Sequence, residues 1–245
     1  MTDLTRRASL ALLGGGAAML GLGSAPAEAA AKRFVAFGDS YTRSFRAGVP
    51  TWADQINAGG AARVLVNLAV SGATAAGSNS QTTLDGQVDR WIGTYRSRGI
   101  PDRTVIYMGN NDVAFGASLT TAMNQYRAQV DRLIANGVTQ GSRRLVLCLL
   151  HDWSRNPSST RSVRSRVRWW NGQLASIAAV RPNVLTVNLF ARLEDVFAHP
   201  AKYGLTNVRV ANRALSASTY LYLDGNHFGR RGHAIIANEV VPKLR

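Results

Sequence analysis

Residues 34–41 read FVAFGDSY, an apolar run that stops abruptly at a glycine, an aspartate and a serine. This is the pattern of a buried strand that ends in a turn. Short apolar runs of the same kind recur along the chain, and longer segments with helical periodicity separate them. We therefore expect strands at Arg33–Phe37, Arg63–Leu68, Arg103–Met108, Arg144–Leu150 and Val184–Leu189.

Helices are predicted between these strands, and they decide the class of the sheet. Near-continuous apolar strands that alternate with amphipathic helices are typical of a parallel sheet covered on both faces. The sequence therefore predicts a single doubly wound α/β domain in three layers, with a five-stranded parallel sheet in the middle. The expected helices lie near Thr51–Ala58, Thr83–Arg98, Leu119–Asn136 and Arg161–Val180, with a last one from about Arg231 to the end.

The carboxyl ends of the predicted strands indicate where to look for chemistry, because doubly wound sheets bind their ligands just beyond these ends. Polar or glycine-rich residues follow several of the strands, at Gly38–Ser40, Ala69–Gly72, Gly109–Asp112 and His151–Asp152. We expect these segments to meet at one edge of the sheet.

The first residues of the chain have the pattern of an export signal. Arg6 and Arg7 precede an apolar, glycine-rich stretch that ends in the small residues SAPAEAAA. The string TRRASL resembles a twin-arginine signal. A membrane anchor is the alternative, but the apolar run is shorter than the ~20 residues that span a bilayer. We expect residues 1–31 to be a signal peptide cleaved near Ala29 to Ala31, and residues 32–245 to be a periplasmic or secreted domain.

The chain is strongly basic, with a formal net charge of +15 that the loss of residues 1–31 would leave unchanged. Such a field can attract nucleic acid, anionic lipid or an acidic polymer, although a solvated basic surface explains it equally well. The densest basic group lies on a predicted helix, which either touches phosphate headgroups or faces solvent: Arg161, Arg164, Arg166 and Arg168. The single cysteine, Cys148, excludes an internal disulfide and is expected to be buried.

Ser40 is the first candidate for chemistry. A serine at a strand-to-helix turn can present its hydroxyl at the sheet edge, where amide N–H groups favour a negative oxygen. The same residue type is also a good helix N-cap. The G-x-S-x-G elbow of α/β-hydrolases does not occur in the chain, so this stretch alone leaves both roles open.

A serine nucleophile needs a base, and His227 is the best candidate among the histidines. Asp224 precedes it by three residues, so in a turn its carboxylate can reach the imidazole and stabilise the imidazolium. An Asx turn beside an incidental histidine is the alternative. Oxyanion donors are offered by the Asn111 side chain and by the unobstructed Gly72 amide, although both residue types are also common in ordinary turns.

Taken together, these blocks resemble the SGNH (GDSL) hydrolase family, which is named for a serine, a glycine, an asparagine and a histidine. The matching segments are FGDSY, NLAVSGAT, MGNNDV and DGNH. Three further segments, HDWSRNP, WWNGQLA and FAHPAKYGLTNV, are similar to the bacterial branch described as phospholipase, lecithinase and hemolysin-like. The chain departs from the family pattern at Tyr41, where the family name has leucine, and at Phe228, where proline is frequent.

The resemblance implies a flavodoxin-like fold and a serine esterase that needs no cofactor or metal. Ser40 would attack an acyl carbonyl, His227 would be the general base, and Asp224 would orient it. The oxyanion would be held by the Ser40 and Gly72 amides and by the Asn111 side chain. The match also makes Asp39 and Asp112 structural, as carboxylates that bond loop amides around the site.

The remaining histidines are weighed separately. His151 and Asp152 follow a predicted strand, so they either line a substrate pocket or make loop hydrogen bonds. His199 and His233 are expected to be structural. No residues have metal-ligand spacing, and no phosphate-binding GxxxxGK[ST] loop occurs.

Several substrates fit an exported ester hydrolase. The leading candidates are small acyl esters and lipid esters, including lysophospholipids. The basic surface favours an anionic membrane interface. A carbohydrate acetylesterase or a polyester depolymerase of the same fold is the alternative. From a different class, the chain would be a decayed enzyme that binds nucleic acid or another polyanion. The candidate catalytic residues are all present, which argues against decay and so against nucleic acid as the partner.

Overall fold

The computed structural model describes residues 31–44, 46–78, 80–116, 118–159, 163–214 and 218–245. The expected signal peptide lies outside these residues except for Ala31, and Arg161 of the basic group also lies outside them. Residues 31–245 form one compact unit.

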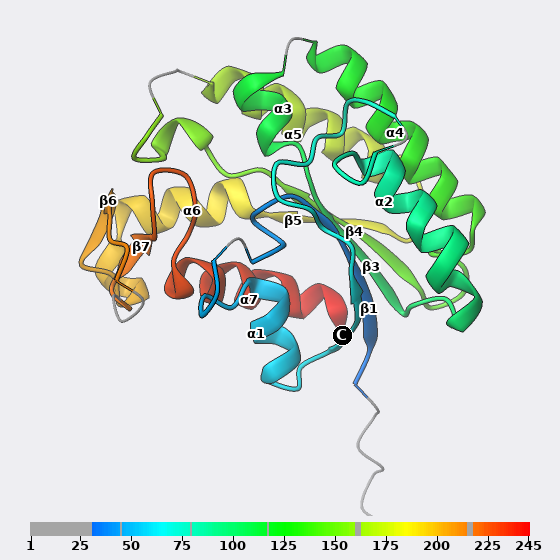
Figure 1. Cartoon of the computed structure of the whole chain (residues 1–245), viewed down its shortest axis with the longest axis horizontal. Helices are drawn as coiled ribbons and strands as arrows, with labels where there is room; N and C mark the ends of the chain where they lie inside the picture. The colour runs from blue at the N-terminus through cyan, green and yellow to red at the C-terminus, as the bar shows by residue number, and fades with distance from the viewer. Residues whose placement is uncertain (1–30, 45, 79, 117, 160–162, 215–217) are drawn as a thin grey trace, which may run out of the picture. The chain divides into compact units, whose positions relative to one another are not determined.

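A five-stranded parallel sheet forms the centre of this unit, as predicted (Figure 1). Its strands lie in the order β2-β1-β3-β4-β5, and each pairs in parallel with its neighbours. This is the flavodoxin-like order, with the reversal of strand order at β1 and β3. The strands are β1 (Arg33–Gly38), β2 (Arg63–Asn67), β3 (Arg103–Tyr107), β4 (Arg144–Leu149) and β5 (Val184–Asn188).

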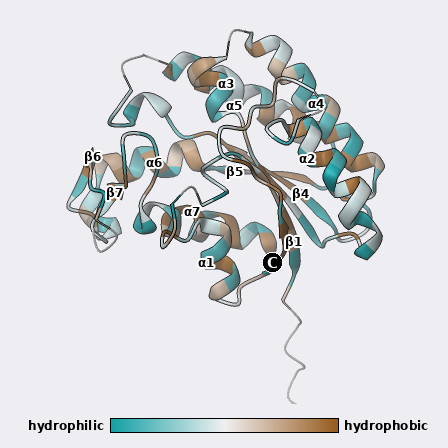
Figure 2. Cartoon of the chain, in the orientation of Figure 1, coloured by the Kyte–Doolittle hydropathy of each residue, from teal (hydrophilic) through white to brown (hydrophobic). Residues whose placement is uncertain are grey.

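Helices cover both faces of the sheet, which confirms the three-layer prediction. On one side α1 (Trp52–Ala58) packs against α7 (Arg230–Leu244), and on the other α4 (Leu119–Ala135) lies between α2 (Leu84–Arg90) and α5 (Arg164–Ala179) (Figure 1). All five residues of β3 are buried, because β3 is central and covered on both faces. The apolar colouring of the strands in Figure 2 follows from the same burial.

The predicted helix Thr83–Arg98 is interrupted. The α-helical part ends at Arg90, and a π-helical turn (Trp91–Tyr95) and a 3-10 turn (Arg96–Arg98) continue it. Several short elements were not predicted. They are α3 (Asn110–Phe115), α6 (Leu189–Ala198), the parallel pair β6 (Asn207–Ala211) and β7 (Tyr220–Tyr222), and the 3-10 turns Trp153–Arg155 and Pro200–Tyr203.

No helix in the described part of the chain combines the length and the apolar character that a membrane span requires.

Candidate active site

Ser40 lies in a tight turn at the carboxyl end of β1. The Thr42 and Arg43 amides both donate to the Asp39 carbonyl at 3.0 Å, which closes the turn. No helix begins here: α1 starts at Trp52, and its N-cap is Thr51, in a capping box with Asp54. The helix-cap alternative for Ser40 is therefore wrong.

Asp224, His227 and Ser40 form one hydrogen-bonded chain. Both carboxylate oxygens of Asp224 lie 3.0 Å from His227 Nδ1, and His227 Nε2 lies 3.0 Å from Ser40 Oγ. Asp224 also accepts the backbone N–H groups of Asn226 at 2.8 Å and His227 at 2.7 Å. The Asx turn and the carboxylate–imidazole pair, which the sequence left as alternatives, thus occur together in the same loop.

The charge on Asp224 is favoured by this geometry. Partial burial, the largest single effect, acts to raise the pKa of Asp224, but the hydrogen bonds from the Asn226 and His227 amides and from the imidazole together lower it below its usual value. An ionised carboxylate at this position fixes the imidazole with Nδ1 as the donor and leaves Nε2 to face Ser40.

Gly72 lies in a turn just beyond β2. The Ala73 amide donates to the Val70 carbonyl at 3.1 Å, and Gly72 has a φ of 78° at the third position of this turn. A type II turn requires that conformation and favours glycine there. Gly72 is exposed, and within the described chain neither its amide nor that of Ser40 donates to another residue. Both N–H groups are therefore available to a ligand.

Helix α3 ties the serine turn and the glycine segment together. Its first three residues are polar, and each one binds a different piece of chain. Asn110 Nδ2 donates to Asp39 Oδ2 at 3.2 Å, and Asn111 Nδ2 donates to the Ala73 carbonyl at 2.8 Å. Asp112 accepts the Ala75 amide at 2.9 Å and the Ala76 amide at 3.1 Å.

The bond to the Ala73 carbonyl orients the Asn111 side chain and leaves it a further donor. A side-chain amide carries two N–H donors, and only one of them is needed for Ala73. The residue is partly exposed, whereas its neighbours Asn110 and Asp112 are buried.

Asp39 and Asp112 bond loop amides, as the sequence analysis expected. Asp39 Oδ1 accepts the Tyr41 amide at 2.9 Å. Burial is the main reason why the pKa of Asp39 rises to about 7, and burial likewise raises the pKa of Asp112. Neither carboxylate is exposed to a substrate.

Comparison with known proteins agrees with this arrangement. The sequence matches the GDSL-like Lipase/Acylhydrolase family over residues 36–235, a range that contains every candidate site residue. The chain belongs to this family. No curated protein matches the chain significantly.

Solved structures with the same fold support the architecture. A lipolytic protein of the G-D-S-L family from Veillonella parvula is 16% identical, with a TM-score of 0.61 over 86% of this chain and 96% of that one. An acetylxylan esterase from Geobacillus stearothermophilus is 18% identical, with a TM-score of 0.58 over 87% of this chain and 94% of that one. At these identities the likeness establishes the fold.

His151 and Asp152, which follow β4, are both buried in this GDSL-family chain. His151 Nδ1 lies 2.9 Å from the Tyr107 hydroxyl and Nε2 lies 3.3 Å from Asn156 Oδ1, while burial lowers the pKa of His151 to about 4. Asp152 is paired with Arg164 and caps the next turn through Ser154. The sequence left two alternatives for His151 and Asp152, a substrate pocket or loop hydrogen bonds. The contacts are those of loop hydrogen bonds, and both side chains are buried.

The basic group on α5 is mostly engaged within the protein. Arg164 binds Asp152 and Glu194. Arg166 donates to three carbonyls at the end of α3, those of Asp112, Val113 and Gly116. The two guanidinium groups therefore hold structure near the site instead of forming a free basic face.

His199 and His233 are placed as structural residues, in agreement with the sequence analysis. His199 Nδ1 lies 2.9 Å from Asp195, and His233 is buried in α7.

Two departures from the family pattern touch each other. The rings of Tyr41 and Phe228 have centroids 5.3 Å apart, and Tyr41 also packs against the His227 ring at 5.9 Å. Sequence reasoning noted both departures but missed Asn156, which bonds the Tyr41 hydroxyl at 2.9 Å. The available signal for Asn156 was its place in the segment HDWSRNP.

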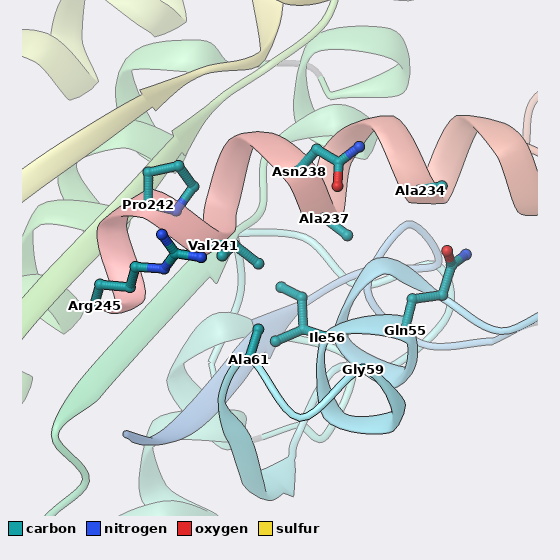
Figure 3. A pocket seen from close by; sticks show the side chains of 10 residues that line it. All are labelled: Gln55, Ile56, Gly59, Ala61, Ala234, Ala237, Asn238, Val241, Pro242 and Arg245. Atoms are coloured by element: carbon teal, nitrogen blue, oxygen red, sulfur yellow. The ribbon is translucent and has the colours of Figure 1, made fainter. Parts of the chain in front are cut away.

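One cavity of the protein lies beside the candidate site, and another lies away from it. A cavity of about 480 Å³ borders the serine and glycine turns and is lined by Arg43, Ser44, Val70 and Ser71 among others. A second cavity, of about 440 Å³, lies between α1 and α7 (Figure 3) and contains no candidate site residue. Within the described ranges no group of three or more His, Cys, Asp or Glu residues is arranged to hold a metal ion.

Proposed function

We propose that this GDSL-family chain hydrolyses carboxylic acyl esters, with Ser40 as nucleophile, His227 as general base and Asp224 as the residue that orients it. The observation that carries the proposal is the unbroken chain from Asp224 through the imidazole to Ser40 Oγ, with 3.0 Å at each contact. These distances lie in the range in which an imidazole can take the serine proton.

In the proposed reaction each of these groups has one role. Ser40 Oγ attacks the acyl carbonyl while its proton moves to His227 Nε2. The Ser40 and Gly72 amides and the Asn111 side chain donate to the oxygen that becomes negative. His227 passes the proton to the leaving alcohol, and water repeats the sequence on the acyl-enzyme to release the acid.

Ser40→Ala and His227→Ala test this assignment. Both variants are expected to lose hydrolysis of p-nitrophenyl esters while remaining folded, and a serine-directed organophosphate should add to Ser40 only in the wild type. Wild-type turnover in either variant, or no adduct on Ser40, would exclude the mechanism. The second of these results, together with salt-sensitive retention on DNA, would instead favour the decayed polyanion-binding protein.

The substrate within this class is proposed from the net charge of the chain and from the similar structures. Lipid esters, including lysophospholipids, are supported by the net charge of +15, which would attract an anionic membrane surface. A carbohydrate acetyl ester is the second candidate, because two of the similar structures are described as acetylxylan esterases. A polyester chain would fit the same chemistry. Esters of increasing acyl length, a lysophospholipid and acetylated xylan, compared by kcat/KM, separate these candidates.

Export is proposed from the sequence alone. If residues 1–31 are a twin-arginine signal, the exported protein should begin after Ala29 to Ala31, and replacing Arg6 and Arg7 with lysine should keep it inside the cell. N-terminal sequencing of the exported protein checks this, and finding Met1 or Thr2 there would contradict it.

A further inference from the structure

Asn156 is the centre of a buried polar network behind the candidate active site. Its side chain is only 3% exposed, yet all of its hydrogen-bonding positions are used. Nδ2 donates to the Tyr41 hydroxyl at 2.9 Å and to the Asn226 carbonyl at 3.2 Å. Oδ1 lies 3.0 Å from the Tyr222 hydroxyl and 3.3 Å from His151 Nε2.

The amide of Asn156 has a single workable orientation. Turning it over would place Oδ1 against the Asn226 carbonyl, so that two acceptors would face each other without a proton. The network is also uncharged at neutral pH, since burial raises the pKa of Tyr41 well above its ordinary value and lowers the pKa of His151 to about 4. Satisfied buried networks of this kind hold their members in one arrangement.

Two donors from this network converge on one backbone carbonyl. The Tyr41 hydroxyl donates to the Asn226 carbonyl, which Asn156 Nδ2 also reaches. Asn226 directly precedes His227, and Tyr41 directly follows Ser40. The neighbour of the nucleophile in the sequence is therefore bonded to the neighbour of the base.

The hydrogen bonds inside the His227 loop determine its conformation, but they do not determine its position relative to the other segments. Asp224 binds the Asn226 and His227 amides, and the Leu223 amide donates to the His227 carbonyl at 2.8 Å. The bonds that join the loop to other segments include those of Tyr41 and Asn156 and one from the Ser158 amide to the Gly225 carbonyl at 2.9 Å. Residues 156–158 thus hold two successive carbonyls of the loop.

We propose that Tyr41 and Asn156 are positioning residues: together they hold the Asn226 carbonyl and so keep the His227 imidazole in line with Ser40 Oγ. The proposal rests on the proposed function of Ser40 and His227, and it deepens that function by adding two residues that act through His227. A shift of about 1 Å in a catalytic group can lower a rate about 100-fold, so small movements of this loop matter.

Tyr41→Phe and Asn156→Asp test the proposal. The first keeps the packed ring and removes only the hydroxyl. The second keeps acceptor atoms for Tyr222 and His151 but removes both N–H donors of the amide. With p-nitrophenyl acetate as substrate, each should lower kcat by about tenfold or more while KM stays within about twofold. Tyr203→Phe is the control, because its hydroxyl is bonded to Asp195 and Arg192, outside the network.

A double variant separates positioning from a loss of stability. If Tyr41 acts through His227, Tyr41→Phe should lower the residual rate of His227→Ala by no more than about twofold, although it lowers the wild-type rate much more. Thermal unfolding of every variant establishes that the protein is folded at the assay temperature.

The outcomes are distinguishable. Wild-type kcat in Tyr41→Phe, an effect on KM alone, an equal loss in Tyr203→Phe, or a full additive loss in the His227→Ala background would each overturn the positioning role. The proposed function would still stand in each of these cases if Ser40→Ala and His227→Ala lose most of the wild-type activity. If those two single variants keep wild-type activity, the proposed function itself fails.

Discussion

At the scale of the single residue, Asn111 has two tasks in the proposed mechanism. One N–H of its side chain holds the Ala73 carbonyl at 2.8 Å, and the other remains for an oxyanion. The first bond places the second donor, because the amide is planar and cannot rotate one N–H without the other. The sequence offered Asn111 only as a donor beyond a strand, whereas the structure adds the bond that orients it.

Asn111→Ala should therefore lower kcat by about 100–1,000-fold, the usual effect of losing one oxyanion donor. The lost bond to Ala73 should also cost ~0.5–1.5 kcal/mol of unfolding free energy. Steady-state kinetics and urea unfolding measure the two effects. Gln173→Ala, in which a polar side chain is removed from α5, is a matched control. If kcat fell no more than in this control, Asn111 would have no part in oxyanion binding.

Helix α3 is the element that assembles the site. It is short, and its N-cap is Gly109, whose φ of 120° and close approach to the Trp170 ring both require glycine. Its polar first turn reads as a loop in the sequence, because a six-residue helix has too few turns to display a helical period. Its far end is held by Arg166, which donates to three backbone carbonyls there.

Arg166→Gln should loosen this element. Hydrogen bonds from a charged donor to the carbonyls would be lost or weakened, so we expect a loss of ~1–3 kcal/mol in unfolding free energy. Activity should fall as well, because α3 carries Asn111. Arg168→Gln, two residues along α5, is the control: Arg168 is exposed, and its contact within the described residues is with the Phe190 ring at 6.0 Å. Equal unfolding midpoints in urea for the two variants would refute a role of Arg166 at α3.

The pH dependence of stability belongs to the whole molecule, because it depends on how the fold buries its histidines. Burial, the main cause, and the nearby His227 lower the pKa of His233 from 6.5 to about 4, against a smaller opposite effect of Asp54. The unfolded chain therefore binds a proton on His233 at a higher pH than the folded chain does. The stability that this residue contributes is present above pH 6.5 and is lost as the pH falls towards 4.

His233→Asn should remove this part of the acid sensitivity. Between pH 7.5 and 4.5 the variant should lose less unfolding free energy than the wild type, as measured by urea unfolding at a series of pH values. Part of the acid sensitivity should persist in the variant, because the pKa of buried His151 is also lowered. Parallel curves for the two proteins would contradict the prediction.

The local sequence determined the framework of this protein. The ends of the five strands in the central sheet were predicted to within a residue, because an apolar run that stops at glycine or polar residues is typical of a buried parallel strand. The order of Ser40, Gly72, Asn111, Asp224 and His227 beyond those strands also predicted which residues meet. That prediction was possible because the carboxyl ends of parallel strands share one edge, whatever the lengths of the segments between them.

Only the tertiary structure decided how these residues are held. It placed Ser40 in a turn with no helix directly after it, and it made His151 and Asp152 buried partners of other residues. It also brought Tyr41 and Asn156, 115 positions apart, onto the carbonyl beside His227. Contacts of this kind depend on packing between distant segments and have no periodicity or spacing in the sequence. For that reason the sequence could name the residues of the site, while their orientation and support became visible only in the folded chain.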